Sequence, residues 1–557
     1  MTTTTSPDTA ARQTATAPAP WPDLVSAALL GTERRMPPVA VRPGQSAAAA
    51  LLDAAAVSTV RRRAALRPAP AGERPAPAPA DPRPALPPAA RRRLSLLLAD
   101  RGGSGGGSRR GTAPDLTELL PQWLAAADAH GYRAPEALLP ALLDAARART
   151  DLRPAALSLA GPRALWLARL NATWKFALRG TGGPADLPGG GDAEAMRRLW
   201  EEGLFAERVA LLTALRRRDP LEGLELLGTT WPTERAEDRL LFLDSLREGL
   251  SASDEPFLER ALSDRSRNVR ATAAELLSAL PGSALAARMA QRAHAHLSLD
   301  RSADPAVLVV EAPHECDAGM QRDGVVPTPP SGRGERSWWL GQLVEAAPLD
   351  GWCERLGGRA PEAIVALPVA DDWRTELHDA WCRAAVRQRN TDWARALLGA
   401  PGAPAQSGEV APAGSARDLT KLLTVLPEDE RAGWVAQFIA AHGLSDAFRM
   451  LGVCAVPWAE PLGRAVVDAL DIARDAGSYP WSFSGVMGLA ERCLDPAEAD
   501  RLDLLTAATD EPEGASPGSG GYWSEAFQRL VGTLRLRATM RAELAPPLAD
   551  TGDGGER

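Results

Sequence analysis

The 557-residue sequence contains almost no lysine, since only Lys175 and Lys421 occur among 63 basic residues. Tyrosine and phenylalanine are also scarce, with 3 and 8 residues, whereas tryptophan occurs 16 times. We attribute the preference for arginine, together with the richness in alanine and proline, to a GC-rich genome. A Walker phosphate loop needs a lysine after its glycine-rich turn. Lys175 follows Trp174 and Lys421 follows Thr420, which excludes that nucleotide site.

Long apolar runs are missing as well. No stretch of 18 apolar residues occurs, and the first 20 residues have no apolar signal core, so we expect neither a membrane span nor export. An odd and scattered cysteine set without a CxxC pair fits reduced thiols in a cytoplasm. The sequence therefore predicts a cytoplasmic protein with five free thiols, at Cys316, Cys353, Cys382, Cys454 and Cys493.

Excess positive charge is absent, because the net charge is −8. This value disfavours a general polyanion binder. The distribution is uneven, with a net charge of +8 on residues 1–115 and −16 on the remainder. A basic arm on an acidic body could bind nucleic acid or an acidic partner. A solvated tail with no binding role explains the same charge pattern. We therefore do not expect nucleic acid as the main partner.

Motifs of catalysis and cofactor binding are not found. The sequence contains no HExxH, GxSxG or EF-hand string. Its acidic clusters each precede or open an expected helix, where carboxylates favour the helix dipole, so we interpret them as caps. We predict no catalytic residue and no cofactor. The acidic clusters are Asp238, Asp254-Glu255, Asp371-Asp372 and Glu428-Asp429-Glu430.

One group of side chains resembles a metal site, formed by His294 and His296 together with His314 and Cys316. Residues two apart on a helix project about 200° from each other, so the first two histidines can chelate one ion only where the helix ends. Zinc needs four such ligands in a tetrahedral array. We interpret these residues as ordinary surface or capping side chains and predict no metal.

The strongest positive signal lies at residues 254–280. Phe257, Leu258, Ala261 and Leu262 form one apolar stripe, and a second stripe returns every third or fourth residue, at Val269, Ala273, Leu276, Leu277 and Leu280. The polar turn between them can cap the second helix through Asp264. This unit resembles a HEAT-type repeat, including Asp264 and the Val269-Arg270 pair. Such a unit cannot bury its apolar face alone, so it implies stacked neighbours.

Similar helical periodicity covers most of the chain, which predicts an all-α fold, an irregular α-α superhelix or HEAT/ARM-like solenoid with disordered Pro/Ala- and Gly/Ser-rich linkers. The expected parts are a disordered N-terminus (1–20), a short helical segment (21–66), a Pro/Ala- and Gly/Ser-rich linker with a short basic helix (67–114), a helical repeat body (115–297), an irregular insert with a strand at 306–313 (298–335), a helical segment (336–399), a second linker (400–416), C-terminal helical repeats (417–545) and a disordered tail (546–557).

Tryptophans gather around the insert. Trp prefers sites with one apolar and one wet edge, which suits both helix cores and binding grooves. The expected loop at 314–335 lies beside this group, and long loops in compact folds are often functional or disordered. Packing of these tryptophans in the helical core is the alternative interpretation. The candidate interaction surface consists of Trp338, Trp339, Trp352 and Trp373.

Three segments resemble a bacterial family of uncharacterised helical-repeat proteins: LVSAALLGTERR at 24–35, the stretch from LPQWL to AGPRALWLARLNATW at 120–174, and ERSWWLGQLVEAAPLDGW at 335–352. The resemblance carries over no site residue. The family's genes often neighbour those of a SWIM zinc-binding protein, a MoxR-type AAA ATPase and von Willebrand A-domain proteins. The resemblance therefore implies an ATPase or von Willebrand A-domain protein as a partner.

We weigh three functions. A non-enzymatic scaffold or adaptor suits stacked helix pairs, which present long surfaces to other proteins. A nucleic-acid-binding or base-modifying protein would use the arginine clusters 61–63, 91–93 and 216–218 with tryptophan stacking. An unrecognised hydrolase with scattered acids is the third, because active sites assemble in space rather than in sequence. The scaffold is the leading interpretation.

The metal interpretation makes a direct prediction. Because we expect the histidines to serve as surface or capping groups, purified protein should contain less than about a tenth of an equivalent of zinc by elemental analysis. Zinc near one equivalent that survives dialysis would contradict this prediction.

Overall fold

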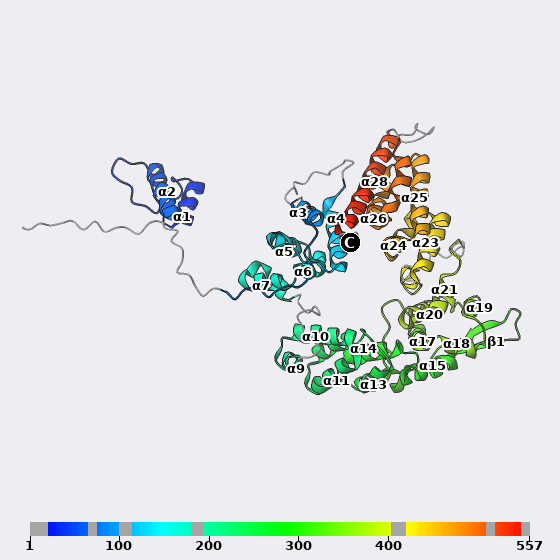
Figure 1. The fold of residues 1–557 in the computed structure, drawn as a ribbon. Helices are drawn as coiled ribbons and strands as arrows, with labels where there is room; N and C mark the ends of the chain where they lie inside the picture. Colours follow the sequence, from blue (N-terminus) through cyan, green and yellow to red (C-terminus); the bar gives the residue numbers. More distant parts are fainter. Residues whose placement is uncertain are drawn as a thin grey trace, which may run out of the picture. The chain divides into compact units, whose positions relative to one another are not determined.

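The structure is a computed structural model, and it describes residues 20–64, 75–99, 114–179, 193–402, 419–507 and 518–546 (Figure 1). The chain divides into two compact units, Met1–Ala78 and Pro79–Arg557. The described residues are mostly helical, as the periodicity predicts, and neighbouring helices are packed in pairs. The segments expected to be disordered at 1–20, 400–416 and 546–557, and the GGSGGGS run, fall almost entirely outside these residues.

The first unit is a small helical hairpin. Helix α1 (Trp21–Leu30) packs on α2 (Ala47–Ala64) through a core of Leu24, Ala27 and Leu51. Gly31 follows α1 with a φ of 83°, a conformation that favours glycine, which confirms the predicted helix stop.

The second unit begins within the expected Pro/Ala linker. Leu86 is buried, and Arg83 donates to the Ser158 carbonyl at 2.6 Å, so this stretch packs on the helical body. One core joins the helices up to residue 179 with the end of the last helix, α28 (Ser519–Leu544), which contributes Met540 and Leu544. The helices of this part are α3 (Pro88–Ala99), α4 (Leu116–Ala129), α5 (Leu139–Ala148), α6 (Arg153–Ala160), α7 (Pro162–Leu170) and α8 (Phe176–Arg179).

Polar contacts reinforce this union of distant segments. Arg93 of α3 forms an ion pair with Glu543 at 2.8 Å, and the Tyr132 hydroxyl donates to the Leu544 carbonyl at 3.0 Å. The first and last helices of this unit therefore contact each other, which no local pattern in the sequence predicts.

The helices from 193 onward form stacked pairs. The contacts α10–α12–α14–α15–α17–α20–α22–α24–α26–α28 make a continuous row, which we call the central row. Several helices outside the row pack against row members as hairpin partners, as α11 does on α10 and α13 on α14. The row helices are α10 (Phe205–Arg218), α12 (Ala236–Ser245), α14 (Arg267–Ser278), α15 (Ala284–His296), α17 (Glu335–Ala346), α20 (Arg374–Gln388), α22 (Leu419–Leu423), α24 (Leu444–Leu451), α26 (Ser484–Cys493) and α28.

The remaining helices of this part are α9 (Ala193–Glu202), α11 (Pro220–Thr230), α13 (Glu255–Ala261), α18 (Asp350–Arg355), α19 (Pro361–Val365), α21 (Thr391–Leu398), α23 (Glu428–His442), α25 (Glu460–Asp475) and α27 (Ala499–Asp503). One large core runs through all of the pairs, from Met196 to Leu534. The HEAT-like unit corresponds to α13 and α14, and both predicted apolar stripes face this core, with only Leu280 half-exposed. The Asp264 carboxylate accepts from the Ser266 amide at 2.8 Å and so holds the polar turn, but no side chain caps α14, and the predicted cap is wrong.

A buried ion pair fixes the geometry before the HEAT-like unit. Arg216 of α10 and Asp254 are both 1% exposed, and the guanidinium meets both carboxylate oxygens, at 2.8 and 2.9 Å. Arg216 also donates to the carbonyls of Pro220, Glu248 and Gly249 at 2.7 to 3.0 Å. Asp254 was expected to be a simple cap. It does accept from the Ser251 amide at 2.9 Å, but its main partner is Arg216.

The insert contains more regular structure than the sequence indicates. The predicted strand is β2 (Val307–Val310), and it pairs antiparallel with β1 (Leu297–Asp300), which we expected to be the end of the helical body and the start of the irregular insert. A short helix, α16 (Ala318–Arg322), lies in the segment expected to be a long loop. The register places Leu297 opposite Val310 and turns both side chains into the core.

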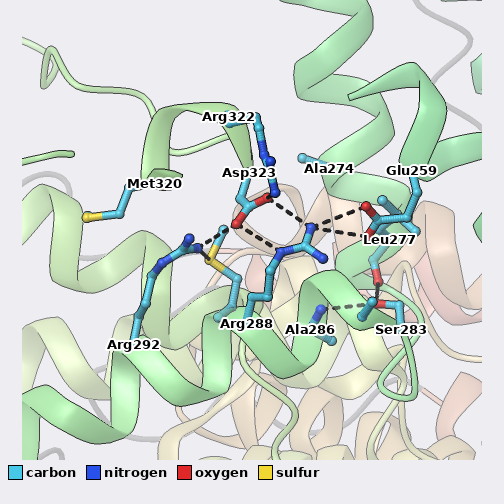
Figure 2. A network of polar contacts seen from close by, with 12 residues as sticks. Glu259, Ala274, Leu277, Ser283, Ala286, Arg288, Arg292, Met320, Arg322 and Asp323 are labelled. Carbon is cyan, nitrogen blue, oxygen red and sulfur yellow. Dashed lines mark hydrogen bonds and ion pairs between the residues drawn. The ribbon is translucent and has the colours of Figure 1, made fainter. Parts of the chain in front are cut away.

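An ion-pair network holds the insert on α15 (Figure 2). Asp323 is fully buried, and it accepts from Arg288 at 2.9 and 3.0 Å and from Arg292 at 2.7 Å. Arg288 also reaches Glu259 of α13, so the network joins three segments. Burial alone would raise the pKa of Asp323, but the hydrogen bonds from the two guanidinium groups outweigh it and lower that pKa.

Residues with positive φ values flank α20 at both ends. The stretch 373–398 consists of two helices, because Arg389 takes the left-handed conformation (φ 52°, ψ 41°) and ends α20. Asp371 and Asp372 precede α20 as predicted, but both have positive φ values and no side chain caps this helix. The capping interpretation of this pair is therefore wrong. The acidic residues at 428–430 do lie in the first turn of α23, where they favour its dipole.

The buried pair makes a stability prediction. Replacing Asp254 with Ala leaves the Arg216 guanidinium charged and without its carboxylate, which should cost about 3–5 kcal/mol of unfolding free energy in urea denaturation. Exchanging both residues for apolar ones of similar size, Arg216→Met with Asp254→Leu, should recover only part of this loss, because the backbone carbonyls that Arg216 binds lose their donor. The control is Arg217→Ala, which removes the neighbouring exposed pair with Glu248 and should leave stability unchanged. Equal effects of Asp254→Ala and Arg217→Ala would contradict the assignment.

Candidate functional site

A hollow with a volume of about 950 Å³ follows the central row. Five segments line it: the turn after α12, the end of α14, α17, the end of α20, and α22. We call it the basic groove. Its charged lining residues are Arg247, Glu275, Glu345, Arg383, Arg387, Arg389 and Lys421, and its other lining residues are Gly249, Leu250, Leu276, Ala279, Leu280, Cys382, Val386, Gln388 and Leu422.

Ion pairs occupy both carboxylates of the groove. Glu345 of α17 accepts from Arg383 of α20 at 2.5 Å and also pairs with Arg387. Glu275 of α14 meets Arg247 at 3.1 Å, with both side chains about 45% exposed. Each pair connects two segments, so the pairs set the spacing between the walls. Over the whole lining, five side chains are basic and two are acidic.

The end of α20 is held firmly at the edge of the groove. The Gln388 amide donates to the Ala347 carbonyl at 2.8 Å and accepts from the Leu349 amide at 3.0 Å. The next residue, Arg389, is exposed and takes a left-handed conformation that residues other than glycine rarely adopt. The helix therefore ends abruptly and places an arginine at the opening.

The four candidate tryptophans do not share one surface. Trp352 is fully buried and lies edge-on to His294 and Trp381, with ring centroids 4.6 and 6.1 Å apart. Trp339 is 8% exposed, and Trp373 is half-buried against the core. Trp352 therefore belongs to the core, which is the alternative to an interaction surface that the sequence left open.

Two of these tryptophans hold the insert instead. The indole N–H groups of Trp338 and Trp339 donate to the carbonyls of Val326 and Pro327, each at 2.8 Å. Trp338 is half-exposed and carries the Arg333 guanidinium over its ring at 5.9 Å, so it offers a partner only an edge.

The sequence did not predict the basic groove, because the residues that line it come from five segments that share no motif.

The histidines of the metal-like group lie in separate environments. His296 Nδ1 lies 2.7 Å from the Glu311 carbonyl at the start of the β-hairpin. His294 contacts Trp352 instead, and His314 is 77% exposed. Among the described residues, no three His, Cys, Asp or Glu side chains come together in a way that could hold a metal ion. Cys316 lies half-buried, and burial raises the pKa of its thiol.

The chain is a mostly helical protein whose neighbouring helices pack in pairs, with a charged groove along them. The chain belongs to a family of unknown function, DUF5691, whose model matches residues 23–544. This membership agrees with the expected resemblance to an uncharacterised helical family. No curated protein and no solved structure matches the chain.

None of the helices in the described ranges combines the length and the apolar character that a bilayer crossing requires.

His294 makes a prediction about pH. Burial lowers the pKa of its imidazole below the ordinary value of 6.5, and the positive charge of Arg355 acts in the same direction. The unfolded chain then binds a proton near pH 6.5 that the folded chain does not, so stability falls as the pH drops below 6.5. Replacing His294 with Phe, which keeps a ring against Trp352, should flatten this slope in denaturation at pH 5 to 7. An unchanged slope would contradict the prediction.

Proposed function

We propose that this protein is a non-enzymatic scaffold or adaptor that binds another protein in the cytoplasm. The basic groove supports this proposal, because its walls belong to five segments that ion pairs hold at fixed distances. A surface built on packed helices loses little conformational entropy when a partner binds. Helical-repeat proteins use extended surfaces of this kind to grip other chains.

The partner class comes from the family resemblance. Genes of such helical proteins lie beside those of MoxR-type AAA ATPases and von Willebrand A-domain proteins, so we propose one of these as the partner. In this proposal the protein links the ATPase to its other components and contributes no chemistry of its own.

A HEAT-like nucleic-acid-binding or base-modifying protein remains the second candidate, and the exposed Arg389 at the groove opening favours it. The arginine clusters weaken it. Arg216 is buried on Asp254, while Arg217 and Arg218 pair with Glu248 and Glu222. Arg93 is paired with Glu543. Nucleic-acid binding would fall steeply with salt, because each phosphate contact releases counterions.

A nuclease-treated pull-down of tagged protein from its own cytoplasm, read by mass spectrometry at low and moderate salt, tests the scaffold. We expect stoichiometric recovery of one or a few proteins, including an AAA ATPase or a von Willebrand A-domain protein. The buried-core variant Ala273→Asp serves as a misfolded control that should recover only chaperones. Recovery of no protein at either salt concentration, together with salt-sensitive binding of DNA or RNA, would contradict the proposal.

A further inference from the structure

The first unit, the hairpin of α1 and α2 (Figure 1), exposes much apolar surface for its length. Its core consists of only Leu24, Ala27 and Leu51, with two further side chains packed against them. A helical pair of this size buries too little surface to be stable alone, so a partner that covers its apolar side chains would stabilise it. Nine of the 21 large apolar side chains that are exposed in the described residues lie here: Trp21, Val25, Leu29, Leu30, Met36, Val41, Leu52, Val57 and Val60.

Part of this surface forms a stripe along α1. Trp21, Val25 and Leu29 are all exposed, and they are spaced four residues apart, so they lie on one side of the helix. We call these three residues the α1 stripe. Two more exposed apolar side chains, Leu30 and Met36, follow at the end of the helix and in the turn after it. Apolar residues therefore gather on one side of α1 and around its end.

Arginines lie at both ends of the α1 stripe. At the first end, the Arg62 guanidinium lies over the Trp21 ring, 5.0 Å from its centre, so the last turn of α2 brings residues 61–63 to this place. At the other end, the amides of Arg34 and Arg35 donate to the carbonyl of the glycine that ends α1, at 3.1 and 3.0 Å. The stripe is therefore bounded by positive charge on two sides.

Most of this charge is not neutralised within the unit. Arg35 pairs with Asp23 at 3.5 Å, whereas Arg34 and the arginines at 61–63 form no ion pair with any residue that the structure describes. Residues 20–64 contain six arginines and three acidic residues, which gives a net charge of +3 on a protein whose total is −8. A surface of this kind attracts an anionic partner.

The form of the surface favours a lipid bilayer over a nucleic acid or a protein groove. A nucleic acid would bind the arginines but would gain little from exposed aliphatic side chains such as Leu29 and Met36. A protein groove has to match its ligand in shape, whereas fluid acyl chains adapt to side chains that project from a helix end and a turn. An indole beside a guanidinium, as in Trp21 and Arg62, suits the level of the lipid phosphates.

We propose that the α1 stripe and its flanking arginines attach this protein to the cytoplasmic surface of a membrane that contains anionic lipids. The stripe enters the boundary between head groups and acyl chains, and the arginines bind lipid phosphates. With ten residues, α1 is too short to cross a bilayer and lies in the plane of its surface. The inference goes beyond the scaffold function and does not depend on it.

Co-sedimentation of the full-length protein with vesicles tests the attachment. One set of vesicles consists of phosphatidylcholine alone, and the other contains about 30% phosphatidylglycerol, which supplies the negative surface potential. We expect binding to the anionic vesicles and not to the neutral ones, with a steep loss as the salt concentration rises, because salt screens the attraction between arginine and phosphate. Equal binding to both sets, or binding to neither, would overturn the inference.

Two variants separate the apolar contribution from the charge. Leu29→Gln removes an apolar side chain that is 82% exposed, so the fold should be kept while vesicle binding weakens about fivefold or more. Arg34→Gln removes one positive charge and should weaken binding about fivefold. The matched controls are Leu504→Gln, at a leucine of the second unit that is 79% exposed, and Arg265→Gln, at an exposed arginine of that unit. A control that weakens binding as much as its matched variant contradicts the assignment.

Other occupants of the stripe give different results. In sedimentation velocity without vesicles, wild type and Leu29→Gln should behave alike, and self-association of the wild type alone would assign the stripe to a second copy. A pull-down in which wild type but not Leu29→Gln recovers the scaffold's partner would assign it to a protein. Binding of a single-stranded oligonucleotide that needs Arg34, without binding to anionic vesicles, would assign the arginines to nucleic acid. Each of these three results would replace the membrane as the partner.

Discussion

The structure depends on the fact that none of its short amphipathic helices can bury an apolar face alone. Each helix of the central row packs against its neighbours in the row, and several also pack against a helix outside it, so one core extends from Met196 to Leu534. The distance between successive helices also has to be fixed at the turns that connect them. Arg216 does this at the turn before the HEAT-like unit, because its guanidinium binds Asp254 and four backbone carbonyls in a volume closed to water.

The same constraint produces the candidate site. The segments after α12 and at the ends of α14 and α20 line one hollow together with α17 and α22, and the ion pairs of Glu275 and Glu345 lie in its lining. Charge and shape therefore arise from the stacking itself rather than from a separate loop. This origin suits a protein that positions other molecules, since a surface fixed by core packing changes little on binding.

Much of the fold could be predicted from the sequence. The stripes of the HEAT-like unit face the core, and the Gly31 stop lies where the glycine indicates it. The partner strand β1 was missed because Leu297–Asp300 has too few β-branched residues to be distinguished from a helix end. The meeting of α3 with α28 could not be found, since Arg93 and Glu543 are joined by tertiary packing alone.

The candidate site was less predictable than the fold. Clusters of tryptophan suggested a surface, yet Trp352 lies in the core, because a large apolar ring gains more by burial than by exposure. The groove depends on residues such as Arg389 whose role is set by a left-handed helix end, and no residue type in the sequence indicates that conformation. Sites assembled from several helices carry no spacing signal, so only the stacked arrangement reveals them.

The central claim is that a protein partner occupies the basic groove, and amide hydrogen exchange with and without the recovered partner tests it most directly. Amides near helix ends exchange faster than those in the core unless a contact protects them. The account predicts slower exchange on complex formation at the groove edges, over residues 275–280, 383–389 and 419–423, with little change around Trp338. Protection confined to other segments, with these three unchanged, would contradict the claim.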